Sequence, residues 1–381
     1  MVEICSIGSL LERKRTKAKD KYHNVPVYAV TNNRGFVLSS SLHDFDIFSD
    51  DTSNYMVVSK NDFAYNPSRL NVGSIAYFKE EGNGLISPMY VVFHADENKI
   101  LAEYLYIVIK SEFVRNKIDA LKEVGARFRF DFNRWGLIKI PIPSLEEQTR
   151  IVGILDTFTS AIDNLKKQIA QRRKQYEYYR DQLLDLEGKP GVEMKTLGEV
   201  CEISGDYGLS APSKPYDGVR YLRITDITDS GGLNNEYVSA DLKEDVVKEP
   251  LVDGDILFAR TGATVGKTLV YRSNFGKCLF AGYLIRYRAR KQVVFPQYLL
   301  HFTHSTKYYN WVSASLAVGA QPNISAQRYN QLQFPLPPLS EQQRIVSILD
   351  TFEASINNLE QQLAQREKQY EYYRNKLLTF E

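Results

Sequence analysis

Apolar side chains recur along two long stretches of the chain at an alternating spacing of four and three residues. This spacing puts them on one stripe of an α-helix, and a stripe of that kind forms the seam of a coiled coil. The residues that define the two seams are Leu155, Phe158, Ile162, Leu165 and Tyr176 in the first stretch, and Leu349, Phe352, Ile356, Leu359 and Tyr370 in the second. We therefore expect two long helices, each of which requires a helical partner.

One position in each seam is charged, Arg172 in the first stretch and Arg366 in the second. A polar seam residue can fix the register and the choice of partner at some cost in stability. The long side chain can equally run along the edge of the seam and place its guanidinium in water. The sequence leaves both interpretations open.

The two stretches belong to an internal repeat. Residues 141–187 recur as 335–381 at a constant offset of 194, without a gap and with about two-thirds of the positions identical. Copies this similar must adopt the same structure, and each is the nearest available partner for the other. We therefore expect an intramolecular antiparallel coiled coil with a pseudo-two-fold axis. An intermolecular rod is the alternative, because the linker 188–194, GKPGVEM, gives the chain a short flexible exit.

A more variable segment precedes each copy, residues 1–140 before the first and residues 195–334 before the second. Alternating apolar residues predict strands at 25–30, 89–95, 219–225, 254–260 and 282–290, and helical periodicity follows at 101–122 and 296–311. Both segments are therefore expected to be α+β domains.

The repeat carries weakly into these domains, where Asp62 and Gly73 line up with Asp255 and Gly266 at an offset of 193. The domains were therefore duplicated together with the helices and then diverged much further. This contrast indicates that the two helices keep one shared function while the two domains have different ones.

The loop 260–268, RTGATVGKT, resembles a phosphate-binding loop but does not match it. That motif requires four residues between its first glycine and the Gly-Lys pair, whereas three separate Gly262 from Gly266. We expect instead an exposed hairpin tip that offers donors to a ligand beside small residues that permit close approach. The donors are Arg260, Thr261, Thr264 and Lys267.

A second polar loop, GAQPNIS at 319–325, aligns by the same offset with GARFRFD at 125–131. Gln321 and Asn323 suit the edge of adenine, whereas Arg127 and Arg129 suit guanine, so the two loops are candidate readers of different base pairs. The alternative is ordinary loop chemistry, with the arginines solvated or paired with phosphates.

Composition permits nucleic-acid binding without requiring it, because a net charge of +2 can conceal local basic surface. No apolar run is long enough for a membrane span, and the N-terminus lacks the order of a secretory signal, so we expect a cytoplasmic protein. His301 and His304 lie one helical turn apart, but no cysteine or carboxylate cluster in the sequence joins them as a ligand set. We therefore expect no metal, no catalytic residue and no chemistry from this chain alone.

The duplicated PLPPLSEQQRIV and LDTF helix sequences, together with GDILFARTGATVGK and GAQPNIS, resemble the specificity subunit of Type I restriction-modification enzymes. The resemblance covers essentially the whole chain, and its helix motif is highly specific. It implies two target recognition domains, each gripping one half of a split double-stranded DNA site from the major groove, with the coiled coil as spacer. By position it adds Arg69 to the candidates of the first domain, although Arg69 stands where the second domain has Gly262.

The resemblance also implies the partners. Two methylation subunits are expected to dock on the helices, and the complex recruits restriction subunits. S-adenosylmethionine, ATP and Mg would then belong to those partners, and this chain would carry no cofactor. The rival interpretation is a duplicated coiled-coil adaptor whose domains bind proteins. Matching domain faces would suffice for an adaptor, whereas diverged domains on preserved helices suit two different half-sites.

Overall fold

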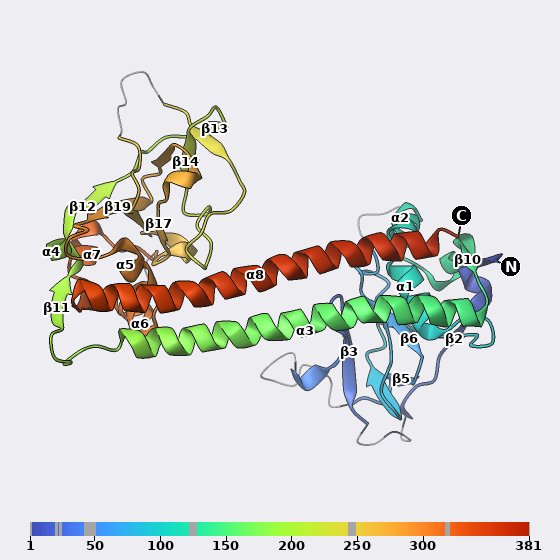
Figure 1. The fold of residues 1–381 in the computed structure, drawn as a ribbon. Helices are drawn as coiled ribbons and strands as arrows, with labels where there is room; N and C mark the ends of the chain where they lie inside the picture. The colour runs from blue at the N-terminus through green and yellow to red at the C-terminus, as the bar shows by residue number, and fades with distance from the viewer. Residues whose placement is uncertain are drawn as a thin grey trace. The chain divides into compact units, whose positions relative to one another are not determined.

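The structure is a computed structural model that describes residues 2–19, 22, 25–41, 51–121, 128–242, 249–316 and 321–380. The chain divides into two compact units. The first comprises Met1–Leu165 and Gln362–Glu381, and the second comprises Lys166–Gln361. Each unit therefore contains one globular domain and a segment of both long helices, α3 (Leu145–Leu184) and α8 (Leu339–Leu378) (Figure 1).

The first unit is built on two four-stranded sheets and one two-stranded sheet, in the orders β2-β9-β6-β7, β4-β3-β8-β5 and β1-β10. Its elements are β1 (Glu3–Ser6), η1 (Ile7–Leu10), β2 (Leu11–Lys14), β3 (Val27–Thr31), β4 (Gly35–Leu38), η3 (Ser39–Ser41), β5 (Met56–Ser59), β6 (Phe63–Tyr65), β7 (Ile75–Tyr77), β8 (Asn83–Ile86), β9 (Val91–Ala95), α1 (Ala102–Lys110), α2 (Glu112–Ala120), η4 (Phe132–Leu137) and β10 (Lys139–Ile142).

The second unit repeats the first sheet and the strand pair, as β12-β19-β16-β17 and β11-β20. Its parallel pair β14-β18 corresponds to β3-β8 of the first unit, and it also contains the pair β13-β15. Its elements are β11 (Glu193–Thr196), α4 (Leu197–Val200), β12 (Cys201–Tyr207), β13 (Ser213–Pro215), β14 (Arg220–Leu222), β15 (Val238–Ala240), β16 (Asp255–Ala259), η5 (Gly262–Thr264), β17 (Thr268–Val270), η6 (Ser273–Phe275), β18 (Cys278–Phe280), β19 (Leu284–Ala289), α5 (Pro296–Phe302), α6 (Thr306–Ser315), α7 (Ala326–Asn330) and β20 (Gln333–Leu336). The shared strand order confirms two related α+β domains.

The structure corrects the predicted elements in two places. The stretches 101–122 and 296–311 are not single helices, because α1 ends before Ser111 and α5 before Ser305. Each serine accepts a hydrogen bond from the backbone of the following helix, which makes both breaks capped helix starts. The predicted strand 219–225 is shorter than expected, since only Arg220–Leu222 pairs, in parallel with β18.

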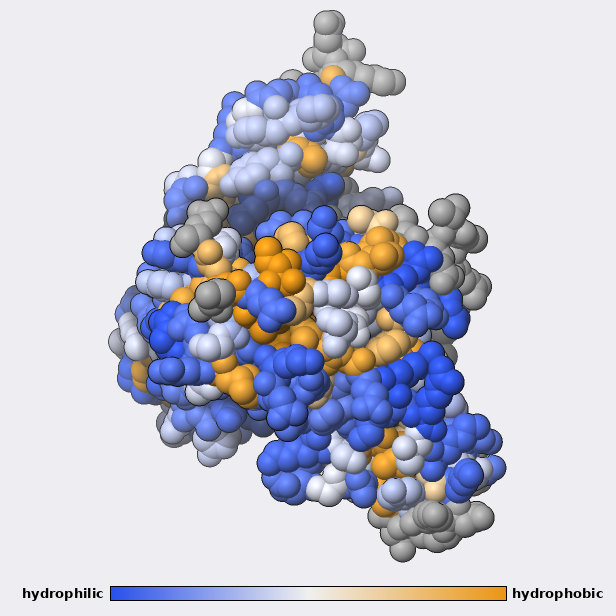
Figure 2. Space-filling model, turned by 90° about the vertical axis from the view of Figure 1, so that its right-hand side faces the viewer, coloured by the Kyte–Doolittle hydropathy of each residue, from blue (hydrophilic) through white to orange (hydrophobic). Residues whose placement is uncertain are grey.

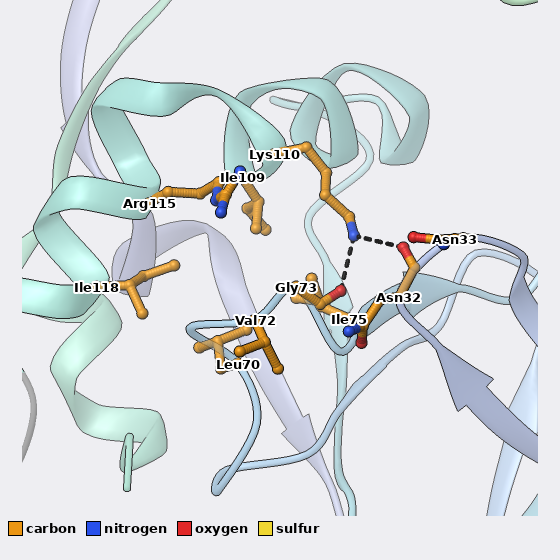
Figure 3. A pocket seen from close by; sticks show the side chains of 10 residues that line it. All are labelled: Asn32, Asn33, Leu70, Val72, Gly73, Ile75, Ile109, Lys110, Arg115 and Ile118. Carbon is orange, nitrogen blue, oxygen red and sulfur yellow. Dashed lines mark hydrogen bonds between the residues drawn. The ribbon is translucent and has the colours of Figure 1, made fainter. Parts of the chain in front are cut away.

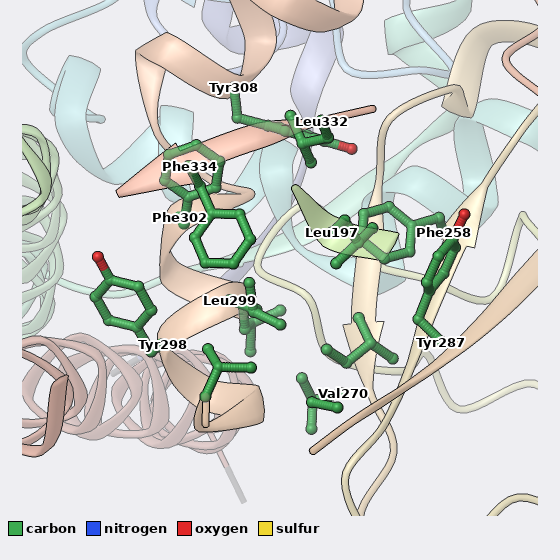
Figure 4. Packing of buried hydrophobic residues seen from close by; sticks show 14 of the residues in the cluster. Leu197, Phe258, Val270, Tyr287, Tyr298, Leu299, Phe302, Tyr308, Leu332 and Phe334 are labelled. Carbon is green, nitrogen blue, oxygen red and sulfur yellow. The ribbon is translucent and has the colours of Figure 1, made fainter. Parts of the chain in front are cut away.

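The core of the second unit lies between its sheet and its helices. Figure 4 shows aromatic and aliphatic side chains from β16, β19, α5 and β20 packed together, among them Phe258, Tyr287, Phe302 and Phe334. The same cluster includes Tyr176 of α3 and Leu349 of α8. The long helices are thus part of the domain core, which holds the domain in a fixed orientation on this segment of the coiled coil.

Within each unit the segments of α3 and α8 pack antiparallel, as predicted. In the first unit the ring of Phe158 packs at 5.2 Å on Tyr373, and in the second the ring of Tyr179 packs at 5.5 Å on Phe352. These two pairs exchange under the offset of 194, so the two units make equivalent contacts between the long helices. The remaining predicted seam residues are buried or half-buried, namely Leu155, Ile162, Leu165, Tyr176, Leu349, Ile356, Leu359 and Tyr370.

The two seam arginines also make equivalent contacts in the two units. The Arg172 guanidinium lies 5.9 Å from the ring of Phe352, and that of Arg366 lies 5.8 Å from the ring of Phe158. Each arginine therefore covers a phenylalanine of the other helix and makes a cation–π contact rather than an ion pair.

Gln148 and Gln342 fix the start of the helices on the two domains. Both side chains are completely buried. Gln148 Oε1 accepts a hydrogen bond from Leu101 N, while its amide nitrogen donates to the carbonyls of Lys99 and Pro143. Gln342 makes the same three bonds in the second unit, to Phe295 N and to the carbonyls of Val293 and Pro337. The sequence analysis did not single out these residues, although both lie in the repeated motif.

No helix in the described part of the chain is both long enough and apolar enough to cross a membrane.

Candidate nucleic-acid interface

The loop 260–268 is a hairpin tip between β16 and β17, as predicted. The strands pair from Ile256–Val270 to Phe258–Thr268, and Lys267 donates its backbone N–H to Thr264. Gly262 and Gly266 have φ values of 69° and 89°, which other residues rarely adopt. The glycines that resemble a phosphate-binding loop therefore serve the turn.

Backbone hydrogen bonds between residues 260–262 and 322–324 join this tip to the second predicted loop, and we call this connection the strap. Thr261 and Asn323 form an antiparallel bridge, Gly262 N donates to Pro322 O at 3.0 Å, and Ile324 N donates to Arg260 O at 2.9 Å. Gln321 and Asn323 are exposed, and Arg260 and Thr261 are half-buried beside them. Two loops about sixty residues apart in sequence thus form one continuous surface; residues 317–320 of the second loop lie outside the described residues.

Two of the predicted donors on this tip are engaged within the protein. Thr264 Oγ1 donates to Thr261 O at 3.3 Å, which supports the turn. Lys267 Nζ lies 2.7 Å from Asp229 Oδ1, and this ion pair lowers the pKa of the Asp229 carboxyl. Arg260 and the 321–323 segment are consequently the better placed donors for a ligand.

The first domain repeats the strap with different residues. Phe130 N donates to Pro67 O at 3.0 Å, in the same relation as Ile324 N to Arg260 O. Pro67 therefore stands where the second domain has Arg260. Arg69 and Arg129 are exposed on either side of this strap. Arg127 lies outside the described residues, so its predicted place beside them stays a prediction.

A cavity of about 170 Å³ lies beside the tip of the first domain (Figure 3). Lys110 Nζ points across it and donates to the carbonyls of Gly73 at 2.7 Å and Asn32 at 3.3 Å. Burial, with a smaller effect of Arg115, lowers the pKa of Lys110 to about 8. In the second domain the hydroxyl of Tyr308 donates to Gly266 O at 2.9 Å. The tip carbonyl is thus held in both domains, by an ammonium in one and by a phenol in the other.

A buried carboxylate anchors each hairpin below its tip. Asp255 is fully buried and accepts two hydrogen bonds from the Arg288 guanidinium, at 2.7 and 2.9 Å. Its counterpart Asp62 contacts Lys14 at 2.6 Å and His94 at 2.9 Å. The sequence aligned the two aspartates but did not identify their cationic partners, which come from neighbouring strands.

The structure corrects the expectation that no carboxylate joins His301. His301 Nε2 lies 2.9 Å from Asp350 Oδ1, and Nδ1 lies 3.1 Å from the hydroxyl of Tyr176, which also contacts Glu353 at 2.9 Å. His301, Asp350 and Glu353 each place one ligand atom within 4.8 Å of the others, a set that could hold a metal ion. Sequence reasoning missed the carboxylates because α8 supplies them from a distant part of the chain. Their polar atoms already bond one another, so the cluster ties α5 to both long helices.

Hydrophobic groups also reach the surface. Figure 2 shows them gathered among hydrophilic residues on one face. In the first unit the exposed apolar residues include Ile4 at 72% and Leu137 at 66%. On the helices Tyr178 and Tyr372, which are equivalent in the repeat, are 61% and 60% exposed. Apolar groups that gather on the surface, as they do in Figure 2, often mark a site of protein contact.

Comparisons with known proteins match nearly the whole chain. The family model described as Type I restriction modification DNA specificity domain matches residues 1–172 and 190–367. The Type I restriction enzyme EcoR124I/EcoR124II specificity subunit of Escherichia coli is 30% identical, over 96% of this chain and 89% of that protein.

Two solved structures share the fold. The type I restriction-modification system S subunit from M. genitalium superposes with a TM-score of 0.61 at 15% identity, covering 100% of this chain and 97% of that one. A chain from a solved type I R-M system gives a TM-score of 0.60 at 20% identity, covering 99% and 97%. The two-domain architecture with paired long helices is therefore common to these chains.

Proposed function

Because this chain belongs to the Type I restriction modification DNA specificity family, we propose that its two domains, residues 1–140 and 195–334, each read one half of a split double-stranded DNA target. The observation that carries this proposal is the strap shared by both domains, at Pro67–Phe130 and Arg260–Ile324. One backbone frame presents two different sets of side chains, which is the arrangement expected of two readers with different sequences to recognise.

We assign the reading surface of the second domain to Arg260, Thr261, Gln321 and Asn323, with Thr264 and Lys267 supporting the tip. Arg69, Arg127 and Arg129 are the candidates in the first domain. Guanidinium groups suit guanine or phosphate, and amides suit adenine, so the domains are expected to prefer different base pairs. The helical segments 141–187 and 335–381 serve as the spacer, and the linker 188–194 joins the first of them to the second domain.

The chain is a non-catalytic recognition subunit of a type I restriction-modification system. Methyl transfer and cleavage, with S-adenosylmethionine, ATP and Mg, belong in this proposal to methylation and restriction subunits in the cytoplasm. Two methylation subunits are proposed because the segment KQYEYYR occurs once on each long helix, with Tyr178 and Tyr372 equally exposed. Two identical surfaces accommodate two identical partners.

Selection on random duplexes tests the proposal. The full-length chain is mixed with its methylation subunit, bound duplexes are isolated by gel shift, and the recovered pool is sequenced. The expected result is a consensus of two different half-sites separated by a gap of fixed length. Recovery of no gapped consensus, together with capture of protein partners by the isolated chain, would favour the adaptor interpretation instead.

A further inference from the structure

Among the described residues no acidic residue pairs with Arg260, unlike several other arginines of the same domain. Arg223 pairs with Asp226, Arg286 with Asp206, and Arg288 with Asp255. In the described part of the chain the Arg260 guanidinium has no such partner, and its Nε is buried without a hydrogen bond. The residue itself is half-buried at the hairpin tip beside the exposed Gln321 and Asn323, so its unneutralised charge is placed where a ligand with acceptor groups could meet it.

The ring of Tyr207 makes a cation–π contact with this guanidinium. The Arg260 Cζ atom lies 4.9 Å from the centre of the Tyr207 ring. The Tyr207 hydroxyl in turn accepts a hydrogen bond from Ala326 N at 3.0 Å. Tyr207 therefore links the cation at the hairpin tip to the helix α7 that follows the 321–325 segment, and stacking restricts the motion of an otherwise flexible side chain.

The backbone around Tyr207 is fixed by two glycines. Gly205 has a φ of 94°, and a Cβ there would come within 2.7 Å of the Ala326 Cβ. A Cβ on Gly208 would lie 2.2 Å from the carbonyl oxygen of Ala281. Any larger residue at these positions would displace the segment, so the ring of Tyr207 is held where Arg260 can stack on it.

We propose that Arg260 reads a guanine in the half-site of the second domain and that Tyr207 is the residue that positions it. The guanidinium offers two parallel N–H donors that match O6 and N7 of guanine in the major groove, which no other base presents together. Stacking on Tyr207 orients this fork before DNA binds and reduces the entropy lost on binding. The inference rests on the proposed function of the second domain as a DNA reader.

The first domain lacks this device, because Pro67 occupies the strap position of Arg260 and offers no donor. The loss of guanine on removing Arg260 is therefore expected in the second domain's half-site only, and the other half-site, read by the arginines of the first domain, provides an internal control within the same DNA molecule.

The test compares selected DNA pools for the full-length chain and four variants, each bound with the methylation subunit. Arg260→Ala should lose the preference for guanine at one position of one half-site, by roughly 5- to 150-fold in relative affinity. Arg260→Lys should retain the charge but lose most of that preference, because an ammonium has no fork. Tyr207→Leu should weaken the same preference for guanine. Tyr207→Phe keeps the aromatic ring and should largely retain that preference.

Arg272→Ala is the matched control, since it removes an exposed charge from the same domain. It should change affinity without changing the consensus. The inference is overturned if the Arg260→Ala pool keeps the guanine, or if Tyr207→Leu weakens every position of the second domain's half-site equally, as a purely structural role would. In either case a gapped consensus for the unmodified chain leaves the proposed function standing. If the unmodified chain yields no gapped consensus, the proposed function and this inference both fail.

Discussion

Two glutamines determine how each domain is attached to its helix. Gln148 and Gln342 are buried and each satisfies one backbone N–H and two carbonyls from segments that would otherwise have no hydrogen-bond partner there. Each lies three residues after the first residue of its helix, so the bonds join the helix start to the loop before α1 or α5. A glutamine suits this role because one amide both donates twice and accepts.

Replacing either glutamine by leucine should therefore destabilise the protein. Gln148→Leu or Gln342→Leu fits the space approximately but leaves three buried backbone groups unpaired, at a cost of about 2 to 3 kcal/mol. Denaturant unfolding of the full chain measures the loss. Gln343→Leu, on the exposed neighbouring position, is the control and should change stability by less than about 0.5 kcal/mol. Equal effects from Gln342 and Gln343 would show that the buried bonds contribute little.

The buried side chain of His304 makes the free energy of unfolding depend on pH. Burial lowers the pKa of His304 to about 4, with His301 and Arg180 adding to the effect, against 6.5 for an ordinary histidine. Between these values the unfolded chain binds a proton that the folded chain does not. The stability associated with neutral His304 is therefore complete above pH 6.5 and is lost as the pH falls toward 4.

His304→Gln should remove this dependence. Between pH 6.5 and pH 5 the unmodified protein should lose about 2 kcal/mol more than the variant. Thermal melting of both proteins across that range provides the measurement. Parallel pH profiles would mean that His304 is protonated in the folded state as well.

At this scale the sequence supports some assignments and not others. The hydrogen-bond donors of the tip, residues 260–267, were identifiable because they lie close together in the chain and alternate with glycines. Tyr207 was not, since its contact with Arg260 depends on how β12 and the hairpin meet in the folded domain. The contacts of Asp350 and Glu353 with His301 could not be predicted for the same reason, because only the packing of α8 against α5 brings these residues together.

At the scale of whole elements, the long helices were the most predictable part. Their heptad spacing depends on local sequence alone, and the gap-free repeat supplied the partner. The breaks at Ser111 and Ser305 were missed because apolar periodicity continues across them, while the decisive signal is a single capping serine in each. The parallel pair β14-β18 repeats β3-β8 of the first domain, whereas β13-β15 has no counterpart among the described residues there, so the repeat gave no indication of it.

The exposed tyrosines of the two helices provide a prediction at this scale. If KQYEYYR is the docking surface for methylation subunits, Tyr178→Ala and Tyr372→Ala should each remove one of two bound subunits, and the double variant should remove both. Native mass spectrometry of the reconstituted complex measures this. Tyr178 and Tyr372 are largely exposed, so their loss should leave the fold intact. A complex that keeps two methylation subunits with both tyrosines replaced would place the docking surface elsewhere.

For the molecule as a whole, the main feature is a set of structural contacts that occurs twice while the exposed loop side chains of the two domains differ. The helix contacts, the glutamine bonds and the loop straps all occur twice, related by the repeat, whereas the side chains on the straps differ. Such an arrangement would allow a reader to change without altering the helices on which the methylation subunits are proposed to dock. The preserved helices and diverged domains seen in the sequence follow from this division.

That division predicts the behaviour of a chain with two copies of one domain. Replacing residues 1–140 by residues 195–334 joins the second domain to Pro141 at the position equivalent to its natural junction with Pro335. Because the sequence repeat predicts a pseudo-two-fold axis, the selected DNA should become an inverted repeat of the second domain's half-site, with the gap length unchanged. The reciprocal chain, with residues 1–140 in both places, is the matched control and should give an inverted repeat of the other half-site. Retention of the original asymmetric target by either hybrid would contradict the assignment of one half-site to each domain, because each hybrid lacks one of the two readers.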